Sequence, residues 1–156
     1  MRGVRVSGRL PGWSAVTAAV TGVVAGCAAA PDAPALYRVD GDAIRERMAS
    51  APGDAARGRE VVMGRDSNCL LCHAVPDAGG RPMGNIGPSL SGVGSRFHEG
   101  QLRLRIVDSM SLNRDTIMPS YYRTDGLTRV AGNWRGKTIL TAQQVEDTVA
   151  YLQTLR

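Results

Sequence analysis

The stretch "SNCLLCHAV", residues 67–75, holds two of the three cysteines of the chain and one of its two histidines. A Cys-x-x-Cys pair can be a redox dithiol, half of a zinc site or an anchor for haem. The chain has 156 residues, enough for one small domain, and only seven of its side chains are Phe, Trp or Tyr. A small domain with so few aromatic side chains needs another source of apolar mass, and a bound macrocycle would supply it.

The histidine that directly follows the second cysteine decides between these alternatives. Cys69 and Cys72 lie about one helical turn apart and can form thioethers with the two vinyl groups of one porphyrin, so that His73 coordinates the iron. A zinc site would need a second pair of ligands, and only His98 and Cys27 remain. A thioredoxin-like dithiol would need a βαβ setting, which the sequence does not offer. The motif therefore predicts one covalently bound haem c.

The second axial ligand of such an iron is expected in "IMPSY", residues 117–121. Met118 precedes Pro119, which keeps this stretch from turning helical and so leaves the methionine in a loop. A methionine opposite a histidine raises the reduction potential and closes the iron to small ligands. The competitors for this position are Met63, Met83, Met110 and His98, the last of which would give a bis-histidine haem.

The stretch "NIGPSL", residues 85–90, fits a second requirement of a ligand histidine. The ring nitrogen that does not bind the metal needs a hydrogen-bond acceptor, which fixes the ring and tunes the iron. The backbone carbonyl of Pro88 in a rigid Gly-Pro turn is the candidate acceptor, although the stretch can also be read as a plain turn. The order Cys-x-x-Cys-His, Gly-Pro-x-Leu, Met-Pro and terminal helix is harder to produce by chance than any one part.

Helical periodicity recurs in three segments separated by loops. Asp54 is a suitable N-cap for the first, and Thr141 with Gln144 forms a capping box for the last. The middle segment is read as a helix with Leu102, Ile106 and Met110 on one face, but its loose alternation also allows a strand. The expected helices cover 54–64, 99–110 and 141–156, and the expected loops cover 77–95 and 114–126. The predicted fold class is all-α, with three to four helices around the haem.

The first 27 residues are typical of an export signal. Arg2, Arg5 and Arg9 precede an uncharged run of small apolar residues that is too short for a comfortable membrane span. The run ends in "VAGC", which resembles a lipobox: cleavage there would leave Cys27 as a lipidated N-terminus, and cleavage just beyond would discard it. The predicted organisation is a signal over 1–27, a tether and surface extension with one helical turn at most over 28–53, and the haem domain over 54–156.

The net charge gives no reason to expect a nucleic-acid partner. The chain carries +5 formally, but three of its 19 basic residues lie in the signal, which leaves 16 against 14 acidic ones. The sequence has no Lys/Arg stripe and no set of stacking aromatic residues. The basic character therefore belongs largely to targeting.

The order of these motifs resembles that of class I c-type cytochromes, over about residues 54–156. A narrower similarity is to the SoxX family, the monohaem subunit of the sulfur-oxidising SoxAX complex, and it begins at about Tyr37 with "YRVDGDAI". The stretches that carry it are "GNIGPSLSGVGSR" (84–96), "QLRLRIVD" (101–108), "TIMPSYYR" (116–123) and "LTRVAGNWRGKTILTAQQVEDTVAYLQTL" (127–155). The resemblance to class I cytochromes implies that the first and last helices cross, with Gly58 at the close approach and Tyr151 packed nearby.

The SoxX resemblance also implies a function and partners. SoxX pairs with SoxA, whose haem is catalytic, and the complex oxidatively joins thiosulfate to a cysteine of the carrier SoxY. The haem of SoxX takes the electrons to a small soluble acceptor cytochrome, so no catalytic residue and no activity of the chain alone are expected. Cys69 and Cys72 carry over as thioether anchors, His73 as proximal ligand and Met118 as distal ligand. The expected location is the periplasm, with a membrane tether if Cys27 is lipidated.

Some assignments are left with alternatives. The chain could instead be a free-standing periplasmic monohaem electron carrier without a fixed partner. Arg96, Arg129 and Trp134 are candidates to hydrogen-bond haem propionates or are ordinary surface and packing residues. Tyr121 and Tyr122 are candidates for the haem edge, the SoxA interface or the core.

Overall fold

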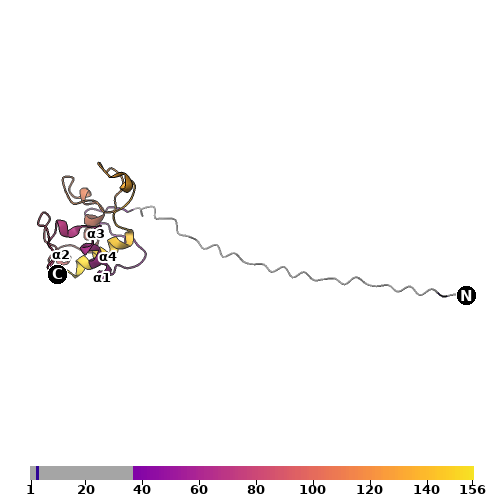
Figure 1. Ribbon diagram of the computed structural model, residues 1–156, viewed down its shortest axis with the longest axis horizontal. Coiled ribbons are helices and arrows are strands. Elements are labelled where there is room, and N and C mark those ends of the chain that lie inside the picture. The colour runs from indigo at the N-terminus through magenta and orange to yellow at the C-terminus, as the bar shows by residue number, and fades with distance from the viewer. Residues whose placement is uncertain (1–2, 4–36) are drawn as a thin grey trace. The chain divides into compact units, whose positions relative to one another are not determined.

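The structure, a computed structural model, describes residue 3 and residues 37–156 (Figure 1). The predicted signal, the lipobox with Cys27 and most of the tether therefore lie outside the described residues. The described part is all-α, as predicted, and its only β-type pairing is an isolated bridge between Asp40 and Ala43. Its elements are α1 (Ala55–Met63), η1 (Cys69–Leu71), α2 (Val93–Arg96), α3 (Glu99–Val107), η2 (Ser109–Ser111), η3 (Gly132–Trp134) and α4 (Ala142–Thr154). None of the described helices is long and apolar enough to span a membrane.

The first and last helices begin where their capping residues predict. The Asp54 side chain accepts a hydrogen bond from the backbone N–H of Arg57, and Gly64 follows the last turn of α1. Thr141 and Gln144 form both bonds of the capping box at the start of α4. The two boundaries are confirmed because each depends on a local side chain to backbone bond that can be recognised in the sequence.

Helices α1 and α4 pack backbone against backbone at Gly58. A Cβ atom at Gly58 would lie 1.8 Å from the carbonyl oxygen of Asp147 and 2.9 Å from Cβ of Tyr151. No side chain fits there without moving a helix, so glycine is what allows the crossing. Gly58 and Tyr151 thus occupy the places that the resemblance to class I cytochromes implied.

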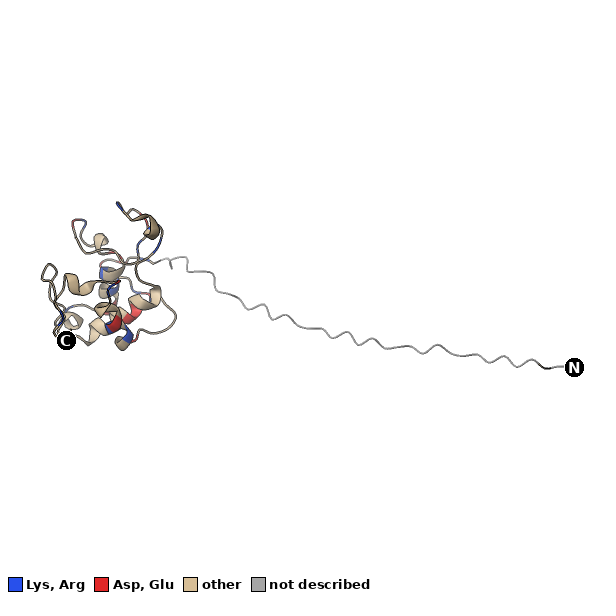
Figure 2. Cartoon of the chain, in the orientation of Figure 1, with Lys and Arg blue, Asp and Glu red and all other residues tan. Residues whose placement is uncertain are grey.

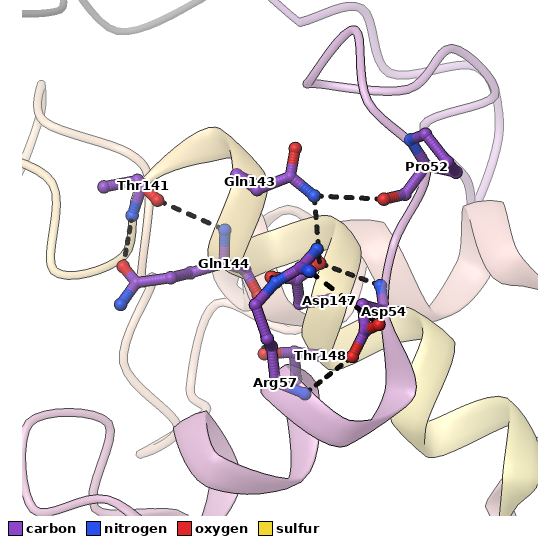
Figure 3. A network of polar contacts seen from close by, with 8 residues as sticks. All are labelled: Pro52, Asp54, Arg57, Thr141, Gln143, Gln144, Asp147 and Thr148. Carbon is purple, nitrogen blue, oxygen red and sulfur yellow. Dashed lines mark hydrogen bonds and ion pairs between the residues drawn. The ribbon is translucent and has the colours of Figure 1, made fainter.

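A polar network ties the start of α1 to the first turns of α4 (Figure 3). The buried carboxylate of Asp147 accepts two bonds of 2.8 Å from the Arg57 guanidinium, one of 2.8 Å from the backbone N–H of Asp54 and one of 2.9 Å from Gln143. Burial alone would raise the pKa of Asp147, but the bonds from Arg57 and Gln143 outweigh it and lower the pKa. The crossing therefore includes an ionised, fully hydrogen-bonded carboxylate.

A second ion pair joins α3, α4 and the segment before α1. The side chains of Arg103 and Glu146 are 1% and 3% exposed and form two bonds of 2.8 Å. Arg103 also donates to the carbonyl of Ile44, and the backbone N–H of Met48 donates to Glu146. In Figure 2, the acidic residues of α4 lie beside the basic residues of α1 and α3.

The segment 37–53 is more than the surface covering that the sequence suggested. Ala43 and Ile44 are both 1% exposed, and Ile44 belongs to the main apolar core. The backbone N–H of Ile44 donates to the carbonyl of Gly100 in α3, and no helical turn forms among residues 37–53. This part of the chain packs as an integral piece of the domain.

Two expected boundaries were wrong. The middle helix ends at Val107 because Asp108 leaves the helical conformation, at φ −149° and ψ 76°, so Met110 lies in η2 instead of extending the apolar face. The loop expected over 77–95 becomes the short helix α2 from Val93 onward. There Gly94 lies against the end of α4, with its N–H bonded to the carbonyl of Leu155. Both departures are set by tertiary contacts that local sequence does not encode.

Candidate haem site

A cavity of about 520 Å³ opens between α1, α3 and the two loops around residues 84–90 and 109–119. Its wall is mainly apolar, and its size lies within the range of roughly 300–1,000 Å³ for pockets that bury small ligands. The structure brings together in this one cavity all five residues that the sequence assigned to the haem: Cys69, Cys72, His73, Pro88 and Met118.

The Cys-x-x-Cys-His stretch forms a single tight turn. Asn68 precedes it in the left-handed conformation, at φ 55°, and the backbone N–H groups of Cys72 and His73 both bond to the carbonyl of Cys69. The two cysteines are free, without a disulfide between them, and burial raises the pKa of the Cys69 thiol. Both sulfurs are therefore on the cavity wall as thiols available for thioether formation.

The start of this turn is held by Tyr121, which follows the loop that carries Met118. The Tyr121 hydroxyl donates a bond of 2.6 Å to the carbonyl of Ser67, and the Ser67 hydroxyl in turn donates to the carbonyl of Val61 in α1. Tyr121 is buried and lines the cavity, and burial raises the pKa of its hydroxyl. This places Tyr121 at the cavity wall, where one of the sequence alternatives had put it.

His73 is fixed by the Gly-Pro turn. Its Nδ1 lies 2.6 Å from the carbonyl oxygen of Pro88, so Nδ1–H is the donor and Nε2 is the nitrogen left to bind a metal. The imidazole packs closely against Gly87, where a Cβ atom would lie 2.5 Å from the ring carbon Cε1. The backbone N–H of Gly87 also bonds to the carbonyl of Cys72, which joins the turn to the anchor.

Met118 is partly buried on the cavity wall, in a loop that returns to the end of α3. Its carbonyl accepts a bond of 2.6 Å from the Ser109 hydroxyl, and its N–H bonds to the side chain of Thr116. The segment after it is bonded to α3, because the N–H of Tyr121 donates to the carbonyl of Ile106. The loop thus has its own supports on both sides of the methionine.

The competing ligand candidates lie elsewhere. His98 is exposed and caps α3, with its Nδ1 accepting from the N–H of Gln101. The sulfur of Met83 accepts a bond of 3.1 Å from the N–H of Val75. Of the described residues that line the cavity, none is Met63, Met83, Met110 or His98. No group of three or more His, Cys, Asp and Glu side chains that could hold a metal ion occurs among the described residues.

Of the three residues considered as hydrogen-bond donors to haem propionates, only one lies at the cavity. Arg96 lines the cavity, where its guanidinium donates to the carbonyls of Ser89 and Ser91. Trp134 and Arg129 do not line it. Trp134 is 44% exposed and belongs to η3, which lies within the orange loop that stands apart from α1 and α4 (Figure 1). Tyr122 is buried and packs edge-on against Tyr37, with ring centroids 6.5 Å apart.

Sequence reasoning missed two residues of the site. Gly87 is needed for contact with the His73 ring, and its signal was present in the Gly-Pro turn, which had been considered only for its carbonyl. Asp108 is buried at the end of α3 and bonds to the loop that carries Met118. No local pattern marks Asp108, because its partners lie up to 15 residues away in sequence.

Comparison with known proteins defines the class first. The sequence model of the cytochrome c family matches residues 55–156. The chain belongs to the cytochrome c family, and haem c is its covalently bound cofactor. The residues present fit that group, because the apolar cavity places two free thiols beside an imidazole whose Nδ1 is already hydrogen-bonded.

The likeness to SoxX is confirmed by a solved structure. The chain is similar to one from the crystal structure of SoxXA from P. pantotrophus, with 33% sequence identity and a TM-score of 0.69. The match covers 80% of this chain and 97% of that chain. No curated protein sequence matches the chain.

Proposed function

We propose that the chain is the electron-transfer haem subunit of a SoxAX-type complex in thiosulfate oxidation. The observation that carries this proposal is the 33% identity to a chain of SoxXA over 97% of that chain's length. So nearly complete a match supports the same role in the same kind of assembly, with SoxA as the partner. A free-standing electron carrier is the alternative.

In this proposal four residues hold one haem. Cys69 and Cys72 would hold the macrocycle through two thioether bonds, each thiol adding across one vinyl group. His73 would hold the iron through Nε2 while Nδ1–H donates to the Pro88 carbonyl, and Met118 would hold it through its sulfur. When bound, the haem supplies a one-electron carrier whose potential is raised by the Met/His pair.

The chain's own residues exclude water and keep the ligands in place. The bond from His73 to Pro88 strengthens the imidazole as a ligand and prevents its rotation. The apolar wall would lower the polarity around a bound iron, which also affects its reduction potential. No residue of the chain is assigned to catalysis in this proposal.

The chemistry itself belongs to the partner. Thiosulfate and the cysteine thiol of SoxY form a sulfur–sulfur bond with release of one proton and two electrons. This chain accepts those electrons one at a time and passes each to a small soluble acceptor cytochrome. It is therefore expected to have no thiosulfate-oxidising activity alone.

The proposed location is the periplasm. Residues 1–27 act as an export signal in this proposal, which fits with attachment of haem c outside the cytoplasm. If processing leaves Cys27 as a lipidated N-terminus, the complex is tethered to a membrane. The mass of the mature chain distinguishes this outcome from cleavage beyond Cys27.

The test is affinity isolation of the C-terminally tagged chain from thiosulfate-grown native cells, followed by haem staining of denaturing gels and mass analysis. The expected result is a second polypeptide with covalent haem at equal stoichiometry. A matched control is the Cys69→Ala/Cys72→Ala variant, whose own band should lose the haem stain. Recovery of the chain alone with one haem would contradict the subunit proposal and favour the free carrier.

A further inference from the structure

The carboxylate of Asp108 is buried at the end of α3 and is contacted by several polar side chains. The residue is 6% exposed, and its side chain accepts bonds from the hydroxyls of Ser111 at 2.5 Å and Ser120 at 3.1 Å. The Arg123 guanidinium lies 3.4 Å from the same carboxylate. Burial alone would raise the pKa of Asp108, but these hydroxyls and Arg123 lower it, which keeps the carboxylate ionised.

The donors to Asp108 come from both sides of Met118. Ser111 lies in η2, on the incoming side of the loop, and Ser120 lies two residues after the methionine. The residue next to Asp108, Ser109, donates to the carbonyl of Met118 itself at 2.6 Å. Side chains of residues 108 and 109 therefore bond to the loop on both sides of Met118 and bring its two ends together.

Backbone bonds alone do not explain this closure. The N–H groups of Tyr121 and Tyr122 bond to the carbonyls of Ile106 and Val107. These bonds fix the outgoing side of the loop from residue 121 onward. Residues 110–117 of the loop are mostly exposed and are bonded chiefly within the loop itself. The side chains of Asp108 and Ser109 join the incoming and outgoing sides, and Asp108 does so through Ser111 and Ser120.

The same carboxylate reaches the segment before α1. Burial, together with the charge of nearby Asp108, raises the pKa of Tyr37 to about 12. The Tyr37 ring packs against Tyr122, which follows Ser120 by two residues. The segment before α1 therefore packs through Tyr37 against the outgoing side of the methionine loop, close to Asp108.

We propose that Asp108 is the positioning residue that holds Met118 at the haem iron. This inference rests on the proposed ligation by Met118 and deepens it. Asp108 touches neither the methionine sulfur nor the cavity; it acts by fixing Ser111 and Ser120, and so sets the width of the loop between them. Without this closure, the loop would open and the sulfur would leave the iron for part of the time.

The decisive variant is Asp108→Asn in the holoprotein. The amide keeps the size of the side chain. Its NH₂ group replaces one carboxylate oxygen and cannot accept a hydrogen bond, so either Ser111 or Ser120 loses its acceptor. The matched control is Asp147→Asn, which changes another buried carboxylate paired with an arginine, at the α1–α4 crossing. Met118→Ala reports complete loss of the proposed ligand.

Two spectroscopic measurements report ligation directly. One is the weak near-infrared band of sulfur-to-iron ligation in the oxidised protein, and the other is carbon monoxide binding to the reduced protein. We expect Asp108→Asn to reduce the band and raise carbon monoxide affinity about tenfold, as for a lost charge-assisted hydrogen bond. We expect Asp147→Asn to leave both unchanged, although it too destabilises the fold.

The outcomes separate the two proposals. If Met118→Ala keeps the near-infrared band, ligation by Met118 is wrong and the role of Asp108 is overturned with it. If Met118→Ala loses the band but Asp108→Asn keeps it and excludes carbon monoxide, only the role of Asp108 is overturned. Equal loss in Asp147→Asn would also overturn it, as an effect of general destabilisation. If Asp108→Asn yields no holoprotein, Ser120→Ala replaces it, and an unchanged band there overturns the proposal.

Discussion

The α1–α4 crossing and the two ligand loops are built in different ways. At the crossing, two helices meet backbone to backbone at Gly58, and charged side chains bridge them (Figure 3). Around the cavity, ligand residues lie in loops held by single bonds to carbonyls and hydroxyls, such as His73 to Pro88 and Ser109 to Met118. The crossing is a rigid scaffold, and the loops are adjustable supports for ligands.

This difference predicts how substitutions act. A helix cannot shift without disturbing all its contacts, so a change at the crossing should lower the free energy of unfolding. A loop can move locally, so a change there should alter haem ligation with a smaller loss of stability. The variants below test this separation, from the largest expected effect to the smallest.

The largest loss of stability is expected where the buried ion pair is broken. Arg103→Met leaves the Glu146 carboxylate buried without its partner, which should lower the free energy of unfolding by about 4 kcal/mol. Guanidinium chloride unfolding of the holoprotein measures this. The matched control is Arg45→Met, which removes an exposed, solvent-screened pair with Asp40 and should leave stability nearly unchanged. Equal losses in the two variants would contradict the scaffold role of the buried pair.

Gly58→Ala should be the next most damaging change. The added methyl group would lie 1.8 Å from the Asp147 carbonyl, so α1 and α4 must separate, at a cost of about 3 kcal/mol. The same denaturant experiment applies. Gly132→Ala is the control, because its Cβ would meet no atom within 4 Å and its φ is not positive. A stable Gly58→Ala variant would mean that the helix contact is not rigid.

The third effect depends on pH. Asp147 has a lowered pKa in the folded state, so its contribution is present above the ordinary pKa of about 4 and lost as the pH falls through the folded value. Asp147→Asn should therefore be about 2 kcal/mol less stable than the wild type at neutral pH. The two proteins should converge as the pH falls through the folded-state pKa of Asp147, because the wild-type carboxyl then becomes protonated as well. A constant difference from neutral to acid pH would show that the charge of Asp147 contributes nothing.

The sequence predicts the scaffold well because its signals are local. The caps Asp54 and Thr141 fix the starts of α1 and α4. Both starts were confirmed, and each depends on bonds between residues only three apart in sequence. The end of α3 was missed because Asp108 leaves the helical conformation there, and its side chain bonds to Ser120 and Arg123, which lie far along the chain. Local patterns do not contain such long-range partners.

The candidate site was predictable in its ligands but not in its supports. The spacing of Cys69, Cys72 and His73 is dictated by covalent chemistry and so is visible as a motif. The roles of Gly87 and Asp108 depend on contacts with His73 and Ser120, which form only when the chain folds. Ile44 shows the same limit, since nothing in its neighbourhood marks it as part of the core.

Gly87→Ala should have the smallest effect on stability and a clear effect at the site. The methyl group would press on the imidazole ring of His73, 2.5 Å from Cε1, and the loop around it can yield, so the loss should be about 1 kcal/mol. Turning the ring weakens its bond to Pro88 and so changes the basicity of the ligand. A shifted reduction potential in spectroelectrochemical titration, with denaturation nearly unchanged, is the expected result. An unchanged potential together with a loss as large as that of Gly58→Ala would instead place this loop in the rigid scaffold.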